Sequence, residues 1–176
     1  VADGLVTGTA TVLVTRSVVS ADLDGDGTFE AIEAALTGVR IGAATVSLNI
    51  GGFGAGVTIT ELAVATIAAD ETATATHHAI VGSGIGATLA LAPVVTGTLT
   101  DGALRYNGHA GTTTTYLDWT TAIDLDGDGT ADAVTIGTSA IDLTSAERYT
   151  ISGTVTGLDV ADGLVTGTAT VLVTRS

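Results

Sequence analysis

VADGLVTGTATVLVTRS forms residues 1–17 of the chain and recurs, identical at every position, as residues 160–176. The two copies are displaced by 160 − 1 = 159 residues. Such identity indicates either a longer protein that repeats a unit of this length or a single unit to which a copy of its first strand has been added. We therefore divide the chain into one repeat unit, residues 1–159, and the first strand of a following unit, residues 160–176.

The duplicated segment alternates apolar and polar side chains, as a β-strand does. One face carries Ala10, Val12 and Val14 and continues with Val18 just beyond the segment, and the other carries Thr9, Thr11, Thr15 and Ser17. Two copies of one strand are expected to compete for one position in a sheet, which leaves an exposed edge that recruits another chain. We expect strand addition to a neighbouring repeat or to another copy of the protein, through Val12, Val14, Val171 and Val173. A frayed terminal segment is the alternative.

Similar alternation continues through the chain, for example in residues 44–50, 57–64, 94–99 and 149–155. Turn signals such as Gly51-Gly52, Asp101-Gly102 and Asn107-Gly108 separate the segments. Many short strands with irregular spacing predict an all-β fold, an antiparallel β-sandwich-like repeat domain. A β-solenoid or β-roll is the alternative. One short helix is expected over residues 28–36, because Phe29, Ile32 and Leu36 would share a helical face.

The composition excludes several classes of function. The 176 residues include 19 Asp and Glu but only 5 Lys and Arg, so the formal net charge is −14 and no basic surface is available for nucleic acid. Cysteine is absent, which excludes disulfides, thiolate metal sites and a cysteine nucleophile. The chain also lacks lysine and a G-x-S-x-G motif, so we expect no enzyme.

Two charge-free stretches, residues 41–60 and 79–100, are long enough to raise the question of membrane insertion. Both are interrupted by glycine and rich in Thr, Ser and Ala, so they indicate strands and we expect no membrane insertion. No basic and apolar leader precedes Val1, so any secretion signal is expected to lie outside these residues.

The strongest chemical signal is DLDGDGTFEAIE, residues 22–33, which places carboxylates at alternate positions around a tight turn. A large hard cation such as Ca²⁺ takes six to eight oxygen ligands, and the alternate side chains of a curled loop can all point inward. Without a cation, three aspartates spaced two residues apart would repel one another. The expected ligands are Asp22, Asp24 and Asp26, with Glu33 closing the shell through two oxygens.

A second loop, DLDGDGTADAVT, covers residues 124–135 and repeats the first seven residues of the first loop. Its expected ligands are Asp124, Asp126, Asp128 and Thr130. Thr135 at the twelfth position cannot bind an ion through two oxygens, and Asp132 is the substitute. The sequence therefore predicts two Ca²⁺ sites, the second weaker or more hydrated than the first.

The first loop resembles the twelve-residue calcium loop of EF-hand and dockerin proteins, with matches at Asp22, Asp24, Asp26, Gly27 and Glu33 and an apolar residue between the last two. The resemblance implies that Thr28 offers its backbone carbonyl and that Glu30 binds directly or through water. It covers only these residues, because a strand and not a helix leads into Asp22. The second loop is similar to calcium loops of β-propeller and thrombospondin-like repeats, which are closed by a carboxylate at the ninth position.

Other polar residues carry weaker signals. His77, His78 and His109 lack the spaced carboxylate of a zinc motif and are expected in exposed loops. Trp119 is expected to fill the core, since the chain has 3% aromatic residues, although an exposed Trp119 beside a bound ion would suit a sugar. Rows of alternate threonines, such as residues 72–76, resemble the flat faces of ice-binding proteins, but threonine is also a common strand residue.

The repeat and the two acidic loops together resemble giant repetitive surface proteins and adhesins of bacteria or archaea. That resemblance implies an extracellular or cell-surface location and a role as a structural spacer, with recognition of a glycan or other surface ligand elsewhere in the full protein. The alternatives are a self-assembling filament or surface-layer subunit joined through residues 160–176, and a glycan-binding or ice-binding module.

Overall fold

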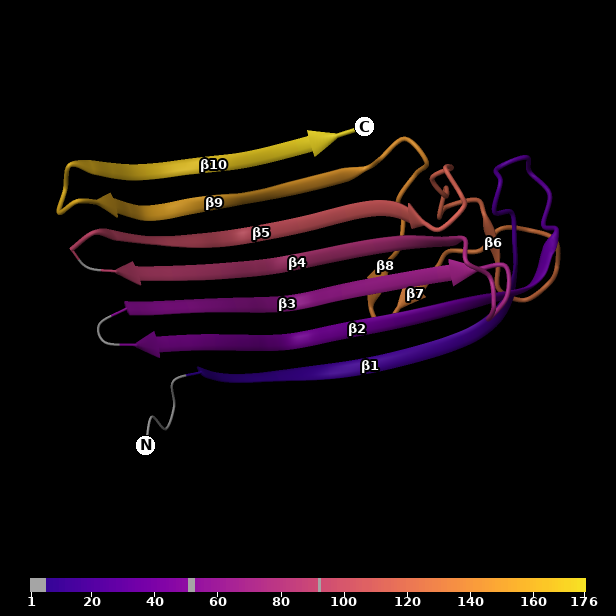
Figure 1. The fold of residues 1–176 in the computed structure, drawn as a ribbon, viewed down its shortest axis with the longest axis horizontal. Coiled ribbons are helices and arrows are strands. Elements are labelled where there is room, and N and C mark those ends of the chain that lie inside the picture. The colour runs from indigo at the N-terminus through magenta and orange to yellow at the C-terminus, as the bar shows by residue number, and fades with distance from the viewer. Residues whose placement is uncertain (1–5, 51–52, 92) are drawn as a thin grey trace.

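The computed structural model describes residues 6–50, 53–91 and 93–176 as an all-β fold (Figure 1). The strands are β1 (Val6–Ala21), β2 (Ala31–Ile50), β3 (Phe53–Ala68), β4 (Thr76–Leu91), β5 (Val95–Ala110), β6 (Ile123–Asp124), β7 (Thr135–Ile136), β8 (Ser139–Ala140), β9 (Tyr149–Val160) and β10 (Val165–Arg175). Eight of them form one antiparallel sheet in the order β10-β9-β5-β4-β3-β2-β1-β6, and β7 pairs with β8 in a separate ribbon.

The predicted helix over residues 28–36 is wrong, because the described part of the chain contains no helix and residues 31–36 begin β2. Leu36 pairs with Ser17 of β1 on one side and with Ile67 of β3 on the other. Ala34 and Leu36 are both buried, which is the period of a strand. Two flanking ladders and a buried face therefore outweigh the helical spacing of Phe29 and Leu36.

The core covers only one end of the long sheet. The connection from β5 to β9, residues 111–148, folds over one sheet face near the end of β1, and we call it the cap (Figure 1). The sheet contributes mostly small buried side chains, and the cap contributes large ones. From the sheet come Val19, Ala21, Ala34, Leu36, Ala63, Ala65, Ile67 and Ala79, and from the cap come Leu117, Trp119, Ala122, Ile123, Val134, Ile136, Ile141 and Leu143.

Small residues on the sheet allow the cap to approach its backbone closely. Gly38 of β2 has no room for a Cβ, because that atom would overlap the side chain of Ile136 in the cap. Alternate side chains of the same strands point to the opposite face. There Val14, Val18 and Tyr106 are exposed, so this end of the sheet has a filled face and a bare one.

Trp119 lies fully buried in the core, as expected from its sequence context. Its indole nitrogen donates to the side-chain oxygen of Asn107 at 3.2 Å. The Asn107 amide nitrogen in turn donates to the carbonyl oxygens of Leu117 at 2.8 Å and Thr144 at 2.9 Å. One buried side chain of β5 thus joins three positions of the cap, because every one of these polar groups needs a partner away from water.

Two predicted turns lie inside a strand. Both Asp101-Gly102 and Asn107-Gly108 belong to β5, which continues to Ala110. Asp101 has a left-handed backbone conformation, φ 52°, at an irregularity of the β5–β9 ladder, so the first signal marks a bulge. Asn107 is held in the strand by its contacts with the cap. The predicted turn at Gly51-Gly52 lies outside the described residues.

The layers differ from the expected arrangement. A sandwich of two packed sheets is not confirmed, since the layer over the sheet is an irregular cap that carries only the β7–β8 ribbon. Residues 41–60 and 79–100, which raised the question of insertion, fall largely in β2 to β5. Within the described ranges, no helix has the length and apolar character that crossing a membrane requires.

The two copies of the duplicated segment do not compete for one position in the sheet. Residues of the first copy form β1, which pairs with β2, and residues of the second form β10, which pairs with β9. The four expected interface valines, Val12, Val14, Val171 and Val173, are 38% to 63% exposed. The repeated strand therefore borders the long ladder on both sides, with only the short β6 beyond β1.

A polar contact ties the cap to the middle of the sheet. Glu61 of β3 accepts hydrogen bonds from the Arg40 guanidinium at 2.9 Å and from the Thr138 hydroxyl at 2.7 Å, and the Ser139 hydroxyl donates to the same carboxylate. These hydrogen bonds lower the pKa of Glu61 from 4.5 to about 2, and the bond from Arg40 has the largest effect, followed by those from Ser139 and Thr138. The ionised carboxylate thus joins β2, β3 and the β7–β8 turn.

Replacement of Asn107 tests the buried network. Asn107→Ala leaves the Trp119 N–H and two cap carbonyls without partners, so we expect a loss of about 2–4 kcal/mol in the free energy of unfolding. Urea unfolding followed by tryptophan fluorescence measures it. The control is Asn49→Ala, at an exposed position of β2, with an expected change below about 0.5 kcal/mol. Equal effects of the two substitutions would contradict the role of the network.

The pKa of Glu61 predicts a dependence of stability on acid. Its pKa is lower in the folded than in the unfolded chain, so its contribution is complete above about pH 4.5 and is lost as the pH falls toward 2. Glu61→Gln should cost about 1–2 kcal/mol at pH 7 and flatten the stability profile in that acid window. Glu71→Gln is the control, because Glu71 pairs with Arg16 in full solvent. Parallel acid profiles for wild type and Glu61→Gln would refute this assignment.

Candidate metal centres

The two acidic loops start from one short antiparallel ladder. Ser20 of β1 pairs with Asp124 of β6, and Ala21 pairs with Ile123. The Asp22 amide continues the contact by donating to the Ala122 carbonyl oxygen at 2.9 Å. Antiparallel strands are related by a local twofold axis, so the loops that follow Ala21 and Ile123 leave the ladder in opposite directions. The first loop follows a strand at the sheet edge, and the second lies within the cap.

Asp22 organises the first loop through backbone hydrogen bonds. One carboxylate oxygen accepts from the amides of Gly25 at 2.7 Å and Asp26 at 3.2 Å, and the other accepts from the amide of Gly27 at 2.8 Å. Gly25 and Gly27 have φ values of 83° and 89°, which other residues adopt only at a cost. The Asp22 side chain is only 6% exposed, so the loop curls around a buried carboxylate.

The second loop has nearly the same internal hydrogen bonds. In both loops the first aspartate accepts from the amides three and five residues later, but its remaining bond comes from the amide four residues later in the first loop and two residues later in the second. Asp124 accepts from the amides of Asp126 at 3.2 Å, Gly127 at 2.7 Å and Gly129 at 2.9 Å, and it is 2% exposed. In each loop the last aspartate of DLDGDGT accepts from the amide of the threonine two residues later: Asp26 accepts from the Thr28 amide and Asp128 from the Thr130 amide, both at 2.8 Å. The shared heptapeptide DLDGDGT therefore specifies one loop conformation in two different surroundings.

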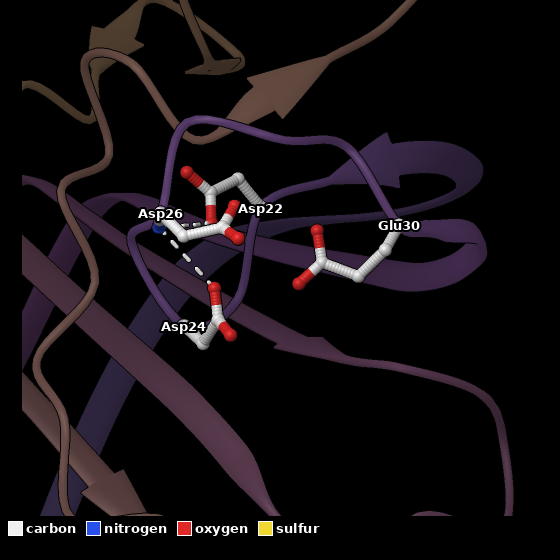
Figure 2. A group of neighbouring side chains, drawn as sticks. All are labelled: Asp22, Asp24, Asp26 and Glu30. Carbon is white, nitrogen blue, oxygen red and sulfur yellow. Dashed lines mark hydrogen bonds between the residues drawn. The ribbon is translucent and has the colours of Figure 1, made fainter.

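Carboxylate oxygens converge at both loops. One oxygen from each of Asp22, Asp24, Asp26 and Glu30 lies within 4.8 Å of the others, and Figure 2 shows Glu30 directed toward the three aspartates from the far side of the loop. Asp124, Asp126 and Asp128 form the corresponding group in the second loop under the same limit. Oxygen groups of this size and spacing suit a hard divalent cation.

Two other predicted carboxylate ligands, Glu33 and Asp132, do not belong to the described groups. Glu33 lies exposed within β2 and belongs to neither described acidic cluster, because residues 31–33 extend as a strand and do not turn back toward Asp22. The Thr28 carbonyl oxygen accepts from the Glu30 amide at 3.2 Å. In the second loop, Asp132 accepts from the Leu125 amide at 2.8 Å and fastens the base of the loop.

Backbone donors also set the electrostatics of the second loop. The pKa of Asp124 is lowered, chiefly by the hydrogen bond from the Gly129 amide and further by those from Gly127 and Asp126, while burial acts in the opposite direction. Asp124 is therefore ionised at neutral pH, which keeps a negative charge at the base of the loop. A cation placed beside it would find a preformed anion.

Sequence reasoning missed the residues that border the first loop from the cap. A hollow between the loop and the cap is lined by Asp22, Asp24, Tyr116, Asp118 and Ser145. Nothing in the local sequence near residue 116 indicated this proximity, because it depends on the ladder between β1 and β6. The aspartate spacing was the only usable signal.

The histidines lie on strands and not in exposed loops. His77 of β4 is buried and pairs with His109 of β5, while His78 contacts the hydroxyls of Thr66 at 3.2 Å and Thr76 at 2.9 Å. Burial lowers the pKa of His77, and the neighbouring His109 and His78 lower it further. The expectation of exposed loop histidines is therefore wrong, because all three lie on strands and His77 is buried.

Comparisons of the chain with protein-family models, with curated proteins and with solved structures find no match. The chemistry of the two loops and the arrangement of the strands are therefore the basis for the functional argument.

Substitution of the buried Asp22 tests whether its hydrogen bonds hold the first loop together in the absence of an ion. In the presence of a chelator, Asp22→Ala removes the acceptor of three backbone N–H groups and should cost about 2–3 kcal/mol, measured by urea unfolding. Asp24→Ala is the control, since the exposed Asp24 accepts only from the Asp26 amide and its loss should cost less than about 1 kcal/mol. If the two variants unfold alike, Asp22 does not organise the loop.

Proposed function

We propose that this chain is a calcium-binding structural unit of a repetitive extracellular or cell-surface protein, and that it acts as a spacer and not as an enzyme. The observation that carries the proposal is the pair of identical DLDGDGT loops, which fold alike and begin on one ladder between the sheet edge and the cap. Their carboxylates offer only oxygen, the ligand that Ca²⁺ prefers.

Charge repulsion gives the ion its structural effect. In the first loop four carboxylates converge, and the buried Asp22 already uses its oxygens to hold the loop backbone. A divalent ion would neutralise the remaining repulsion among Asp24, Asp26 and Glu30. Waters or backbone carbonyls would complete a shell of six to eight oxygens, because the acidic side chains alone supply too few ligands.

Ion binding at the two loops would fasten the cap to the sheet. The first loop connects β1 to β2, and the second follows β6 in the cap. Because β6 pairs with the last residues of β1, any stiffening of the loops is transmitted to the junction between the two layers. Such a unit resists unfolding where calcium is plentiful, as it is outside cells, and softens where calcium is scarce.

The structure supports the three alternative functions to different degrees. Sugar stacking required an exposed Trp119, and this side chain is buried. One observation supports the assembly of subunits into a filament: the repeated strand lies at both borders of the long ladder. Binding to ice has no feature in its favour beyond exposed threonine rows, such as Thr7 beside Ser47 and Thr9 beside Thr45.

Calcium titration tests the proposal. Isothermal calorimetry should show two sites per chain with dissociation constants of about 10⁻⁴ to 10⁻³ M. In 10 mM calcium each site would then add about 1.4–2.7 kcal/mol. The two sites together should raise the melting temperature by roughly 5–20 °C over its value in EDTA. The double variant Asp24→Asn with Asp26→Asn should lose one site.

The matched control changes the net charge without touching either loop. Asp162 is an exposed aspartate in the β9–β10 turn, and Asp162→Asn should bind calcium as the wild type does. Absence of calorimetric heat together with equal melting temperatures in calcium and in EDTA would overturn the proposed role. Stabilisation by magnesium to the same extent would overturn the assignment to calcium, since Mg²⁺ demands a smaller octahedral site.

A further inference from the structure

β1 and β10 run in the same direction at opposite borders of the long ladder. Each step along the order β1-β2-β3-β4-β5-β9-β10 is antiparallel, and six such steps restore the original direction. Figure 1 shows the two strands running in the same direction on either side of the other long strands. Since residues 6–17 and 165–176 are identical, the same strand occupies both borders in the same direction.

The two copies also present the same side chains to the same face. A continuous row of direct cross-strand partners joins Val12, Ile41, Leu62, Gly82, Leu104, Ile151 and Val173. Directly paired residues lie on one face of a sheet, so Val12 and Val173 share a face. Val173 is the copy of Val14, which lies two residues beyond Val12 and therefore on that same face. The second copy is displaced by two residues along the strand.

Because β1 and β10 run in the same direction and place the same side chains on the same face, the free edge of β10 matches the edge that β1 uses to pair with β2. In a strand of fixed direction, residues whose side chains point to one face direct both backbone groups to one edge, and alternate residues use the other edge. β1 uses the edge that meets β2, and β10 uses the opposite edge, which meets β9. The backbone groups that β10 leaves open are thus the ones that its copy uses against β2.

Two contacts outside the regular ladders agree with this assignment. The Arg175 carbonyl oxygen accepts from the Arg148 amide at 3.0 Å, so odd-numbered residues of β10 face β9. The Asp22 amide donates away from β2, to Ala122, so even-numbered residues near the end of β1 face outward. Arg16, the copy of Arg175, falls in that outward set. The open edge of β10 accordingly belongs to Thr170, Leu172 and Thr174.

We propose that residues 165–175 are a shared strand, the last of one unit and the first of the unit that follows in the same chain, so that consecutive units form one uninterrupted antiparallel sheet. The occupant of the open β10 edge is β2 of the next unit, the strand that already binds the identical residues of β1. Val173 would lie between Ile151 of its own unit and Val39 of the next. Ile151 already pairs with Val173, and Val39 pairs with Val14, the residue of which Val173 is the copy.

This inference rests on the structural role proposed above, but it involves neither acidic loop. Its experiment uses a two-unit protein in which residues 18–176 are repeated after Ser176, so that residues 160–176 are followed by a complete second unit. The single-unit chain of residues 1–176 is the reference. Both proteins are measured in calcium and in EDTA.

Hydrogen exchange followed by NMR measures how well the amides at the open edge of β10 are protected. In the single unit, the amides of Thr170, Leu172 and Thr174 should exchange rapidly, whereas those of Val171 and Val173 should be protected by β9. In the two-unit protein the first three should slow by about 100-fold or more, and the last two should stay protected. Unchanged rapid exchange of the outer amides in the two-unit protein would overturn the shared strand.

Disulfide formation tests the register, and the natural chain has no cysteine to interfere. Val173→Cys in the first unit and a cysteine at the Val39 position of the second should cross-link within one chain, since side chains of directly opposed residues outside the hydrogen-bonded pairs lie closest. A cysteine at the Val46 position, farther along the same strand, should not cross-link with Val173→Cys. Cross-links between chains, or equal cross-linking at both positions, would overturn the proposal.

The two proposals fail separately. Loss of calcium heat with protected outer amides would leave the shared strand in place and remove the metal role. Exposed outer amides with normal calcium binding would retain the metal role and make the units independent domains.

Discussion

The structure depends on the antiparallel backbone ladder, which runs through strands of 11 to 20 residues and is covered by the cap at one end only. Each interior strand is paired along most of its length with a neighbour on both sides, so the backbone groups of the sheet have partners beyond the end covered by the cap, apart from a few bulges. Side-chain burial is concentrated at one end, where small sheet residues such as Ala63 and Ala65 receive the large side chains of the cap. Backbone pairing thus determines the size of the sheet, and packing against the cap stabilises one end of the sheet.

The acidic loops belong to that anchored end, and backbone groups shape them before any ion is considered. Asp22 and Asp124 each collect three backbone amides, which fixes the curl and directs the next aspartates inward. The short β1–β6 ladder then sets the two loops about one local axis. A site of this kind is preorganised, so binding an ion would cost little ordering of the backbone.

Part of this arrangement followed from sequence alone. Strand alternation and the aspartate spacing are local signals, and they correctly predicted an all-β chain, a buried Trp119 and two acidic turns. Failures occurred where distant partners decided the outcome. The segment 28–36 has helical spacing, yet Leu36 is held between β1 and β3. Asn107-Gly108 looks like a turn, yet Asn107 is held in its strand by carbonyls of the cap.

The even register of the sheet has a consequence for the symmetry of a longer array. One unit contributes six strands, β1 to β5 and β9, before the repeated sequence returns with a two-residue displacement. At the usual spacings this is a step of about 29 Å across the strands and about 7 Å along them. Because both counts are even, no step turns the ribbon over. Every cap would therefore stand on the same face of the continuous sheet, and the opposite face would carry exposed valines such as Val12, Val14 and Val173.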